Sequence, residues 1–172
     1  MKSRKKIKIL GVGDYGIGMV EEISKDHTDN IEYFNLNTDW AFLNEYKNPS
    51  IKLGPKTARG FGAAGYIVAG KMAAEESRKD IIESIKDAGL VIIVAGLGGG
   101  TGSGASPVVA SISKELNIPV FAFVTTPFEF EGKIRCKNSE ESIKELKGIV
   151  DLLIITPLNK RSDIKKERDG IT

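Results

Sequence analysis

Residues 90–116 read LVIIVAGLGGGTGSGASPVVASISKEL, and this stretch decides the fold. Its first part, residues 90–95, is a continuous apolar run rich in β-branched side chains, which is typical of a strand covered on both faces of a parallel sheet. A glycine-rich segment, residues 96–104, follows the run. From Ala105 onward the apolar residues recur at helical spacing, so the sequence predicts a strand, a glycine loop and a helix in that order.

The glycine loop is predicted to bind a phosphate group. A helix N-terminus presents unpaired backbone N–H groups, and the helix dipole favours an anion there. Glycines let the backbone approach phosphate oxygens closely and adopt positive φ angles. Thr101 and Ser103 add hydroxyl donors, and Ser103 or Ser106 is also suited to cap the helix. A flexible linker is the alternative, but a buried strand and a helix bracket the loop, which also lacks the lysine of Gly-x4-Gly-Lys-Ser/Thr.

Two more glycine-rich segments come earlier in the chain. Residues 7–10 predict a short buried strand, followed by the turn GVGDYGIG at residues 11–18 and a helix to about Lys25. This turn matches G-x-G-x-x-G, which on its own predicts a dinucleotide-binding enzyme, with Asp39 at the distance expected of its ribose-binding acid. A third glycine-rich loop occupies residues 56–65.

The remaining elements alternate between strands and helices. This alternation favours an α/β fold: a doubly wound, mainly parallel sheet with helices on both faces and ligand loops at the carboxyl ends of the strands. Asn37, at the end of the second strand, is the preferred candidate for a ligand contact. For Thr38 and Asp39, a ligand contact and a cap on the next helix are equally expected. The other predicted strands are residues 31–36, 51–53, 118–124 and 150–155, and the other predicted helices are residues 40–45, about 67–88 and about 136–147.

These motifs carry a resemblance to a known family. Residues 98–104, GGGTGSG, resemble the signature loop of the FtsZ/tubulin family, and residues 129–135, EFEGKIR, resemble its Phe-x-Glu-Gly-x-x-Arg segment. Without the glycine loops, residues 129–135 would be read as an exposed charged loop. The resemblance implies a Rossmann-like tubulin/FtsZ GTPase domain that binds GTP or GDP, with Mg²⁺ accompanying the triphosphate. It also implies a cytoplasmic role in the cell-division (septation) cytoskeleton.

The resemblance also implies which residues hold the nucleotide. In the family, the glutamate and arginine that match Glu131 and Arg135 reach the ribose. No catalytic residue is assigned. The candidate nucleotide-binding residues are Gly11, Gly13, Gly16, Gly18, Asn37, Gly62, Ala63, Ala64, Gly65, Gly98, Gly99, Gly100, Thr101, Gly102, Ser103, Thr125, Pro127, Glu131, Arg135 and Asn159.

Two of the loops depart from the family pattern. Asp14, Tyr15 and Ile17 stand where the family has glycines, and an added carboxylate is unfavourable near a triphosphate unless a cation bridges the two. After the third loop, Tyr66 and Ile67 stand where the family has Asn-Pro, which loosens the start of the next helix.

Composition and charge limit the number of domains and the kinds of partner that the chain is expected to have. The chain has 172 residues, of which 41% are hydrophobic, enough for one well-buried domain. We expect a basic N-terminal arm at residues 1–6, an FtsZ-like nucleotide-binding domain at residues 7–159 and a polar basic tail at residues 160–172. Short basic ends are typical of solvated tails, so no nucleic-acid partner is expected.

Several sites and segments are not expected from the sequence. The longest apolar runs are too short for a membrane span or a signal peptide. The single Cys136 suits a reducing cytoplasm, and the single His27 has no second His or Cys to complete a protein metal site.

The resemblance implies an incomplete catalytic site. It ends where the family's central helix would begin, before the base-binding aspartate, the acidic loop that completes the neighbouring subunit's site, and the second domain. We therefore expect a nucleotide-binding domain that hydrolyses little GTP alone and meets itself or a full-length family member through its nucleotide face. The alternatives are a non-catalytic module that caps or regulates full-length filaments, and an NAD-dependent enzyme, for which no acid/base pair can be named.

Overall fold

The structure is a computed structural model that describes residues 5–26 and 28–158. The predicted candidate Asn159, the predicted tail at residues 160–172 and most of the predicted arm lie outside the described residues. The last residue of that arm, Lys6, is the first residue of a strand.

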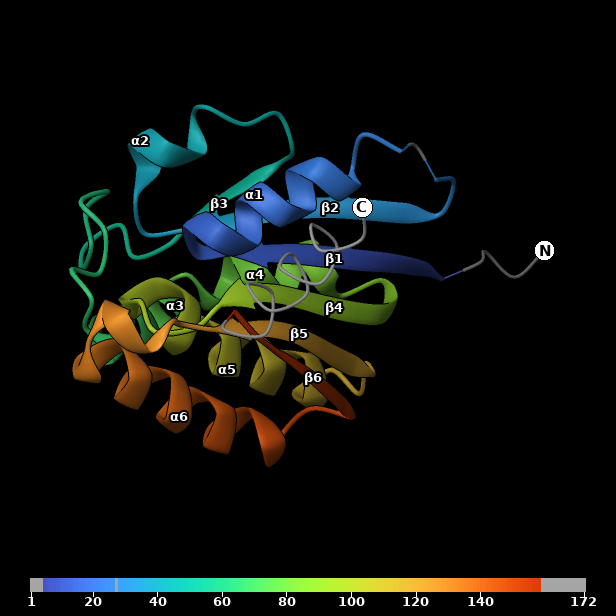
Figure 1. Cartoon of the computed structure of the whole chain (residues 1–172). Coiled ribbons are helices and arrows are strands. Elements are labelled where there is room, and N and C mark those ends of the chain that lie inside the picture. Colours follow the sequence, from blue (N-terminus) through green and yellow to red (C-terminus); the bar gives the residue numbers. More distant parts are fainter. Residues whose placement is uncertain (1–4, 27, 159–172) are drawn as a thin grey trace, which may run out of the picture.

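Six parallel strands form one sheet in the order β3-β2-β1-β4-β5-β6 (Figure 1). The predicted parallel sheet is therefore confirmed. The strand order reverses between β1 and β4, and in open α/β sheets such a reversal opens a crevice at the carboxyl ends of the strands. The strands are β1 (Lys6–Val12), β2 (Ile31–Asn37), β3 (Ser50–Lys52), β4 (Ala88–Gly96), β5 (Val120–Thr126) and β6 (Leu152–Pro157).

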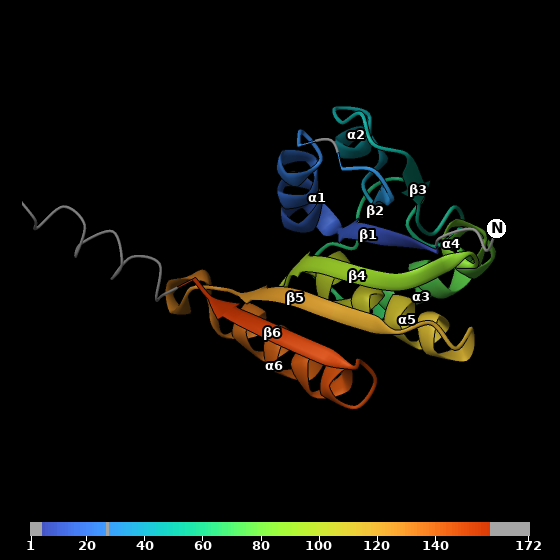
Figure 2. The ribbon, with the colours of Figure 1, turned by 90° about the vertical axis from the view of Figure 1, so that its right-hand side faces the viewer.

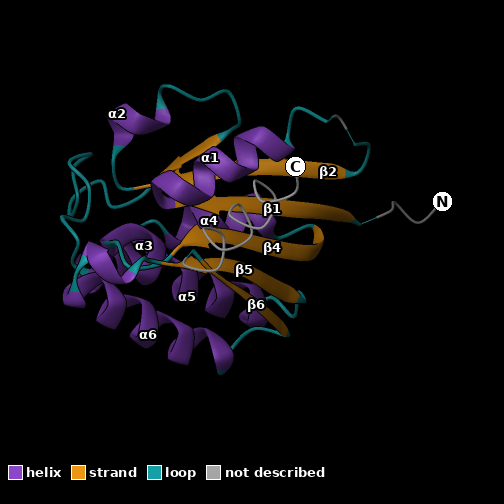
Figure 3. Ribbon diagram, in the orientation of Figure 1, coloured by secondary structure: helices purple, strands orange, loops and turns teal. Residues whose placement is uncertain are grey.

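Helices cover both faces of this sheet, as predicted (Figures 2 and 3). On one face, α1 packs against β1, β2 and β4; on the other, α5 packs against β4, β1 and β5, with α3, α4 and α6 packed on α5. The helices are α1 (Gly13–Ile23), α2 (Trp40–Leu43), α3 (Ile67–Glu76), α4 (Arg78–Ile85), α5 (Gly100–Glu115) and α6 (Lys133–Lys147), and a 3-10 turn, η1 (Glu129–Glu131), precedes α6.

The main hydrophobic core lies between the sheet and α5. Leu10, Ile93 and Ala122 on three adjacent strands are fully buried in one cluster with Val109 and Ile112 of α5. Full burial of a Leu, Ile or Val side chain stabilises the fold by about 1.5–3 kcal/mol. The core therefore fixes α5 on the sheet, and with it the end of the helix that faces the ligand loops.

Two of the predicted glycine loops turn out to be helical. The helix α5 begins at Gly100 rather than at Ala105, and α1 begins at Gly13, inside the predicted turn 11–18. Both helix starts lie close to neighbouring backbone: the position of a Cβ on Gly16 would be 2.2 Å from the Val94 carbonyl oxygen. Helix propensity disfavours glycine, so local reasoning placed both starts too late, and tertiary packing overrides that propensity.

The single helix predicted for about residues 67–88 is two helices. The break falls at Ser77, whose φ of −92° and ψ of 16° separate α3 from α4. Its hydroxyl accepts a hydrogen bond from Gly54 N at 3.0 Å and donates one to the Lys52 carbonyl at 3.3 Å. Ala88, the last residue of the predicted apolar stripe, belongs instead to β4. The helical spacing of the apolar residues was predicted correctly. The break was not, because the hydrogen bonds that hold Ser77 come from Lys52 and Gly54, which are distant in sequence.

Candidate functional site

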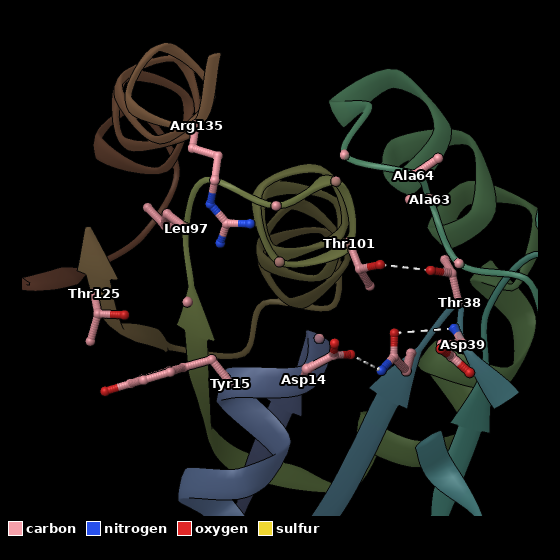
Figure 4. A pocket seen from close by; sticks show the side chains of 18 of the residues that line it. Asp14, Tyr15, Thr38, Asp39, Ala63, Ala64, Leu97, Thr101, Thr125 and Arg135 are labelled. Atoms are coloured by element: carbon pink, nitrogen blue, oxygen red, sulfur yellow. Dashed lines mark hydrogen bonds between the residues drawn. The ribbon is translucent and has the colours of Figure 1, made fainter. Parts of the chain in front are cut away.

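A cavity of about 370 Å³ lies where the strands end, around the reversal of strand order (Figure 4). Its walls are formed by residues at or directly after the ends of β1, β2, β4, β5 and β6, together with the loop 62–65 and the η1–α6 segment. Clefts of this volume are typical of small-molecule and cofactor sites. The segments that sequence analysis singled out therefore meet at one place.

Three helices begin at this cavity without a side-chain cap. The N-cap residues are Val12 for α1, Tyr66 for α3 and Gly99 for α5, and none makes a side-chain hydrogen bond to its helix. The first backbone N–H groups of a helix have no intrahelical partner, and each helix start carries the positive end of a dipole. Such a convergence of donors stabilises an anionic group without needing basic side chains.

Asn37 is buried at the end of β2, where both ends of its amide are bonded. Its Nδ2 donates to Asp14 Oδ1 at 2.7 Å, and its Oδ1 accepts from Asp39 N at 3.2 Å. Asp39 in turn caps α2, because its Oδ1 accepts from Phe42 N at 3.1 Å. The capping alternative for Asp39 is thus confirmed, although the residue also lines the cavity.

Hydroxyl groups join the signature loop to its surroundings. Thr38 and Thr101 share a hydrogen bond of 2.6 Å, which ties the end of β2 to the first turn of α5 (Figure 4). Ser103 is buried, and its Oγ accepts from Gly98 N at 2.8 Å. Neither Ser103 nor Ser106 caps α5, so that prediction is wrong. Of these residues, Thr38 and Thr101 line the cavity.

An ion pair forms another wall of the cavity. Glu131 accepts a hydrogen bond from Phe128 N at 2.8 Å through Oε1, and its Oε2 lies 2.9 Å from Arg135 Nε. Figure 4 shows Arg135 reaching from α6 toward the cavity. Among the described lining residues, Arg135 is the one basic side chain, against the carboxylates of Asp14, Asp39 and Glu131. An anion placed in this cavity would therefore depend largely on backbone donors.

Most of the candidate residues line this cavity. Those that do are Gly13, Asn37, Gly62, Ala63, Ala64, Gly65, Gly99, Gly100, Thr101, Gly102, Thr125, Glu131 and Arg135.

The other described candidates do not line the cavity. Among them, Gly16 packs closely against β4, and the hydroxyl of Ser103 is bonded to Gly98. The described candidates absent from the lining are Gly11, Gly16, Gly18, Gly98, Ser103 and Pro127. Asn159 lies outside the described residues.

Seven of the lining residues are absent from the list of candidate nucleotide-binding residues, although Asp14, Tyr15, Thr38 and Asp39 were noted in the predicted ligand loops. Most of them follow a strand directly or stand beside a candidate residue, so position at a strand end was the available signal. These residues are Asp14, Tyr15, Thr38, Asp39, Gly96, Leu97 and Leu158.

Metal sites and membrane-spanning helices can be considered for residues 5–26 and 28–158, the part of the chain that the structure describes. Within these ranges, no group of three or more His, Cys, Asp or Glu side chains is arranged to hold a metal ion. Within the same ranges, no helix has the length and apolar character needed to span a membrane.

Comparisons with known proteins agree with this geometry. A sequence model of the Tubulin/FtsZ family, GTPase domain, matches residues 6–165. The Cell division protein FtsZ of Mycoplasmopsis pulmonis (strain UAB CTIP) is 45% identical over 155 residues, which cover 90% of this chain and 40% of that protein. This chain thus spans less than half the length of that curated relative.

Solved structures show the same similarity. The FtsZ dimer of M. jannaschii, described as empty, matches with a TM-score of 0.91 at 38% identity, covering 95% of this chain and 48% of that one. CetZ1 from Haloferax volcanii, described as a GDP-bound monomer, matches with a TM-score of 0.79 at 28% identity, covering 88% of this chain and 51% of that one. Since the family model matches nearly all of the sequence and the fold agrees, the chain belongs to the tubulin/FtsZ family and contains its GTPase domain.

Proposed function

We propose that the cavity binds GTP or GDP and that the chain acts as the cytoplasmic nucleotide-binding domain of an FtsZ-type cell-division GTPase. The observation that carries this proposal is the convergence of three uncapped helix N-termini on one cleft. The GDP-bound state of the similar CetZ1 structure supports a guanine nucleotide as the ligand.

The proposed contacts divide between phosphates and ribose. Backbone N–H groups at Gly99–Thr101 and in the loop 62–65 would hold the phosphates, and Glu131 with Arg135 would hold the ribose. Hydroxyl and carboxylate oxygens suit Mg²⁺, and Thr101 and Asp14 present such atoms at the cavity. When bound, Mg²⁺ supplies positive charge beside a triphosphate that would otherwise lie near the Asp14 carboxylate.

A calorimetric titration tests this proposal directly. We expect saturable binding of GDP and of GTP with Mg²⁺, and binding of NAD that is weaker by at least about tenfold, or roughly 1.4 kcal/mol. Discrimination against ATP should be smaller, because one neutral hydrogen bond to the base contributes only about 0.5–1.5 kcal/mol. Tighter binding of NAD than of GDP in the same titration would show that the guanine-nucleotide assignment is wrong.

Hydrolysis by this polypeptide alone is expected to be slow. Each carboxylate of the described lining is already engaged: Asp14 with Asn37, Asp39 with Phe42 N, and Glu131 with Arg135. We infer that these bonds hold the three carboxylates in structural roles and that none of them positions a water for attack on a phosphate. We expect phosphate release at least about 100-fold slower than from a full-length relative at equal concentration, or about 2.7 kcal/mol in the barrier. Equal rates would contradict this reading.

A second candidate function is the capping of full-length FtsZ filaments through the nucleotide face. Exposed apolar side chains flank the cavity: Phe61 precedes Gly62, Tyr66 follows Gly65, and Phe130 precedes Glu131. Exposed apolar groups gathered at one face are typical of protein–protein contacts.

Light scattering during FtsZ assembly tests this capping function. If it is correct, the chain shortens the filaments even at about one molecule for every twenty FtsZ subunits. One bound molecule is enough to block a filament end, so the amount needed depends on the number of ends and not on the number of subunits. An unchanged scattering amplitude together with an unchanged GTPase rate of the mixture would exclude it.

A further inference from the structure

One side chain on α6 joins two of the glycine loops. Asn138 Nδ2 lies 3.0 Å from the carbonyl oxygen of Gly65 and 3.0 Å from that of Gly98. Both partners are acceptors only, so the amide NH₂ must face them, and its two hydrogens match the two carbonyls. Asn138 belongs to none of the sequence motifs described above, and the residue is absent from the cavity lining.

The backbone of the two loops that Asn138 joins departs from the usual helix and strand conformations. Positive φ angles occur at Gly62 (82°), Ala64 (47°), Gly65 (78°) and Gly98 (110°). For Ala64 this conformation is unfavourable, because a Cβ destabilises the left-handed region by about 1–2 kcal/mol. Such a backbone persists only where its surroundings hold it, and the amide of Asn138 provides part of that support.

The helix that carries Asn138 is itself anchored nearby. One turn further along, Ser142 Oγ donates to the Ser103 carbonyl at 2.9 Å, and Glu145 pairs with Lys71 of α3 at 2.8 Å. Residues spaced by three or four lie on one face of a helix, so Asn138, Ser142 and Glu145 form one contact face toward α3 and α5. Arg135, one turn before Asn138, reaches toward the cavity (Figure 4).

We propose that Asn138 is a positioning residue that holds the loop 62–65 and the loop at Gly98 at the separation a phosphate chain requires. The proposal rests on the nucleotide-binding function proposed above. Gly65 of one loop and Gly99 of the other line the same cavity, and a triphosphate, which is one phosphate longer than a diphosphate, would extend further between them. Asn138 therefore contributes more to the affinity for GTP than to the affinity for GDP, and it links both loops to the helix that carries Arg135.

The test compares Asn138→Ala with Glu140→Ala, which changes an exposed position on the same helix. Alanine has a higher helix propensity than asparagine, so α6 itself is not weakened by the first substitution. Calorimetry measures the affinities for GTP with Mg²⁺ and for GDP, and thermal unfolding measures stability without nucleotide. Amide hydrogen exchange without nucleotide follows residues 62–66 and 98–101.

For Asn138→Ala we expect GTP affinity to fall about tenfold and GDP affinity about threefold, as two neutral hydrogen bonds are lost. We also expect faster exchange in both loops and only a slightly lower unfolding midpoint, because the higher helix propensity of alanine offsets part of the loss of the two hydrogen bonds. Glu140→Ala should change none of these.

Two results would overturn the proposal: an unchanged ratio of GTP to GDP affinity with unchanged exchange, or a loss of both affinities that merely follows a lowered unfolding midpoint. If the unsubstituted chain binds no guanine nucleotide, the proposed function fails. The exchange measurement then decides separately whether Asn138 holds the two loops.

Discussion

Replacing Gly99 with valine is expected to abolish GDP binding while leaving the fold intact. Gly99 lines the cavity at the start of α5, and its φ of −82° and ψ of 171° are accessible to any residue. A Cβ built on it meets no heavy atom within 4 Å. The valine side chain would therefore project into open space without disturbing a neighbour. If phosphate occupies that space, affinity should fall at least about 100-fold, or roughly 2.7 kcal/mol.

The matched control for this experiment is Gly18→Val. Gly18 also has no heavy atom within 4 Å of a Cβ, but it lies on α1 and is absent from the cavity lining. We expect the control to bind GDP with unchanged affinity, as measured by calorimetry. Gly100 is a poorer target than Gly99, because its Cβ would lie 2.8 Å from both Ala63 Cβ and the Tyr66 carbonyl oxygen. Normal GDP binding by a folded Gly99→Val chain would show that no phosphate occupies this position.

The parallel sheet and the edge that carries the ligand loops could be predicted because parallel strands obey a simple rule. A strand buried on both faces must be a continuous apolar run, as at residues 90–95, and its carboxyl end must lie at the ligand edge. Glycine-rich or polar residues directly after such a run, such as Asn37 and Thr101, could therefore be assigned to the site. Both residues line the cavity.

Contacts between distant segments could not be predicted in this way. Lys8 belongs to a run of basic residues, yet it is 4% exposed and pairs with Glu32 and Asp87. Nothing local to residue 8 indicates these partners. Asn138 is a similar case, because its two carbonyl partners lie 73 and 40 residues away in sequence. Pattern reasoning detects which face of an element is apolar, whereas single polar bonds between loops need coordinates.

The glycines of the signature loop divide into two groups that sequence cannot separate. Gly99 faces open space, whereas Gly104, together with Gly70 of α3, lets α5 and α3 cross at close range. A Cβ on Gly104 would lie 2.3 Å from the Ile67 carbonyl oxygen and 2.7 Å from Lys71 N, and these are backbone atoms that cannot rotate away. The first group serves the proposed ligand, and the second serves the helix packing that carries the first.

Replacing Gly104 with valine is therefore expected to destabilise the fold itself. Overpacking a core contact costs about 1–3 kcal/mol, and more where backbone must move. Because backbone must move here, we take the upper end, about 3 kcal/mol, which lowers the unfolding midpoint of a chain of this size by about 6–12 °C at roughly 2–4 °C for each kcal/mol. Thermal unfolding of Gly104→Val, Gly99→Val and Gly18→Val side by side measures this difference. An unfolding midpoint of Gly104→Val equal to that of Gly99→Val would mean that a Cβ at residue 104 does not clash with the Ile67 carbonyl oxygen, 2.3 Å from its expected position. The division of the loop into ligand-facing and packing glycines would then be wrong.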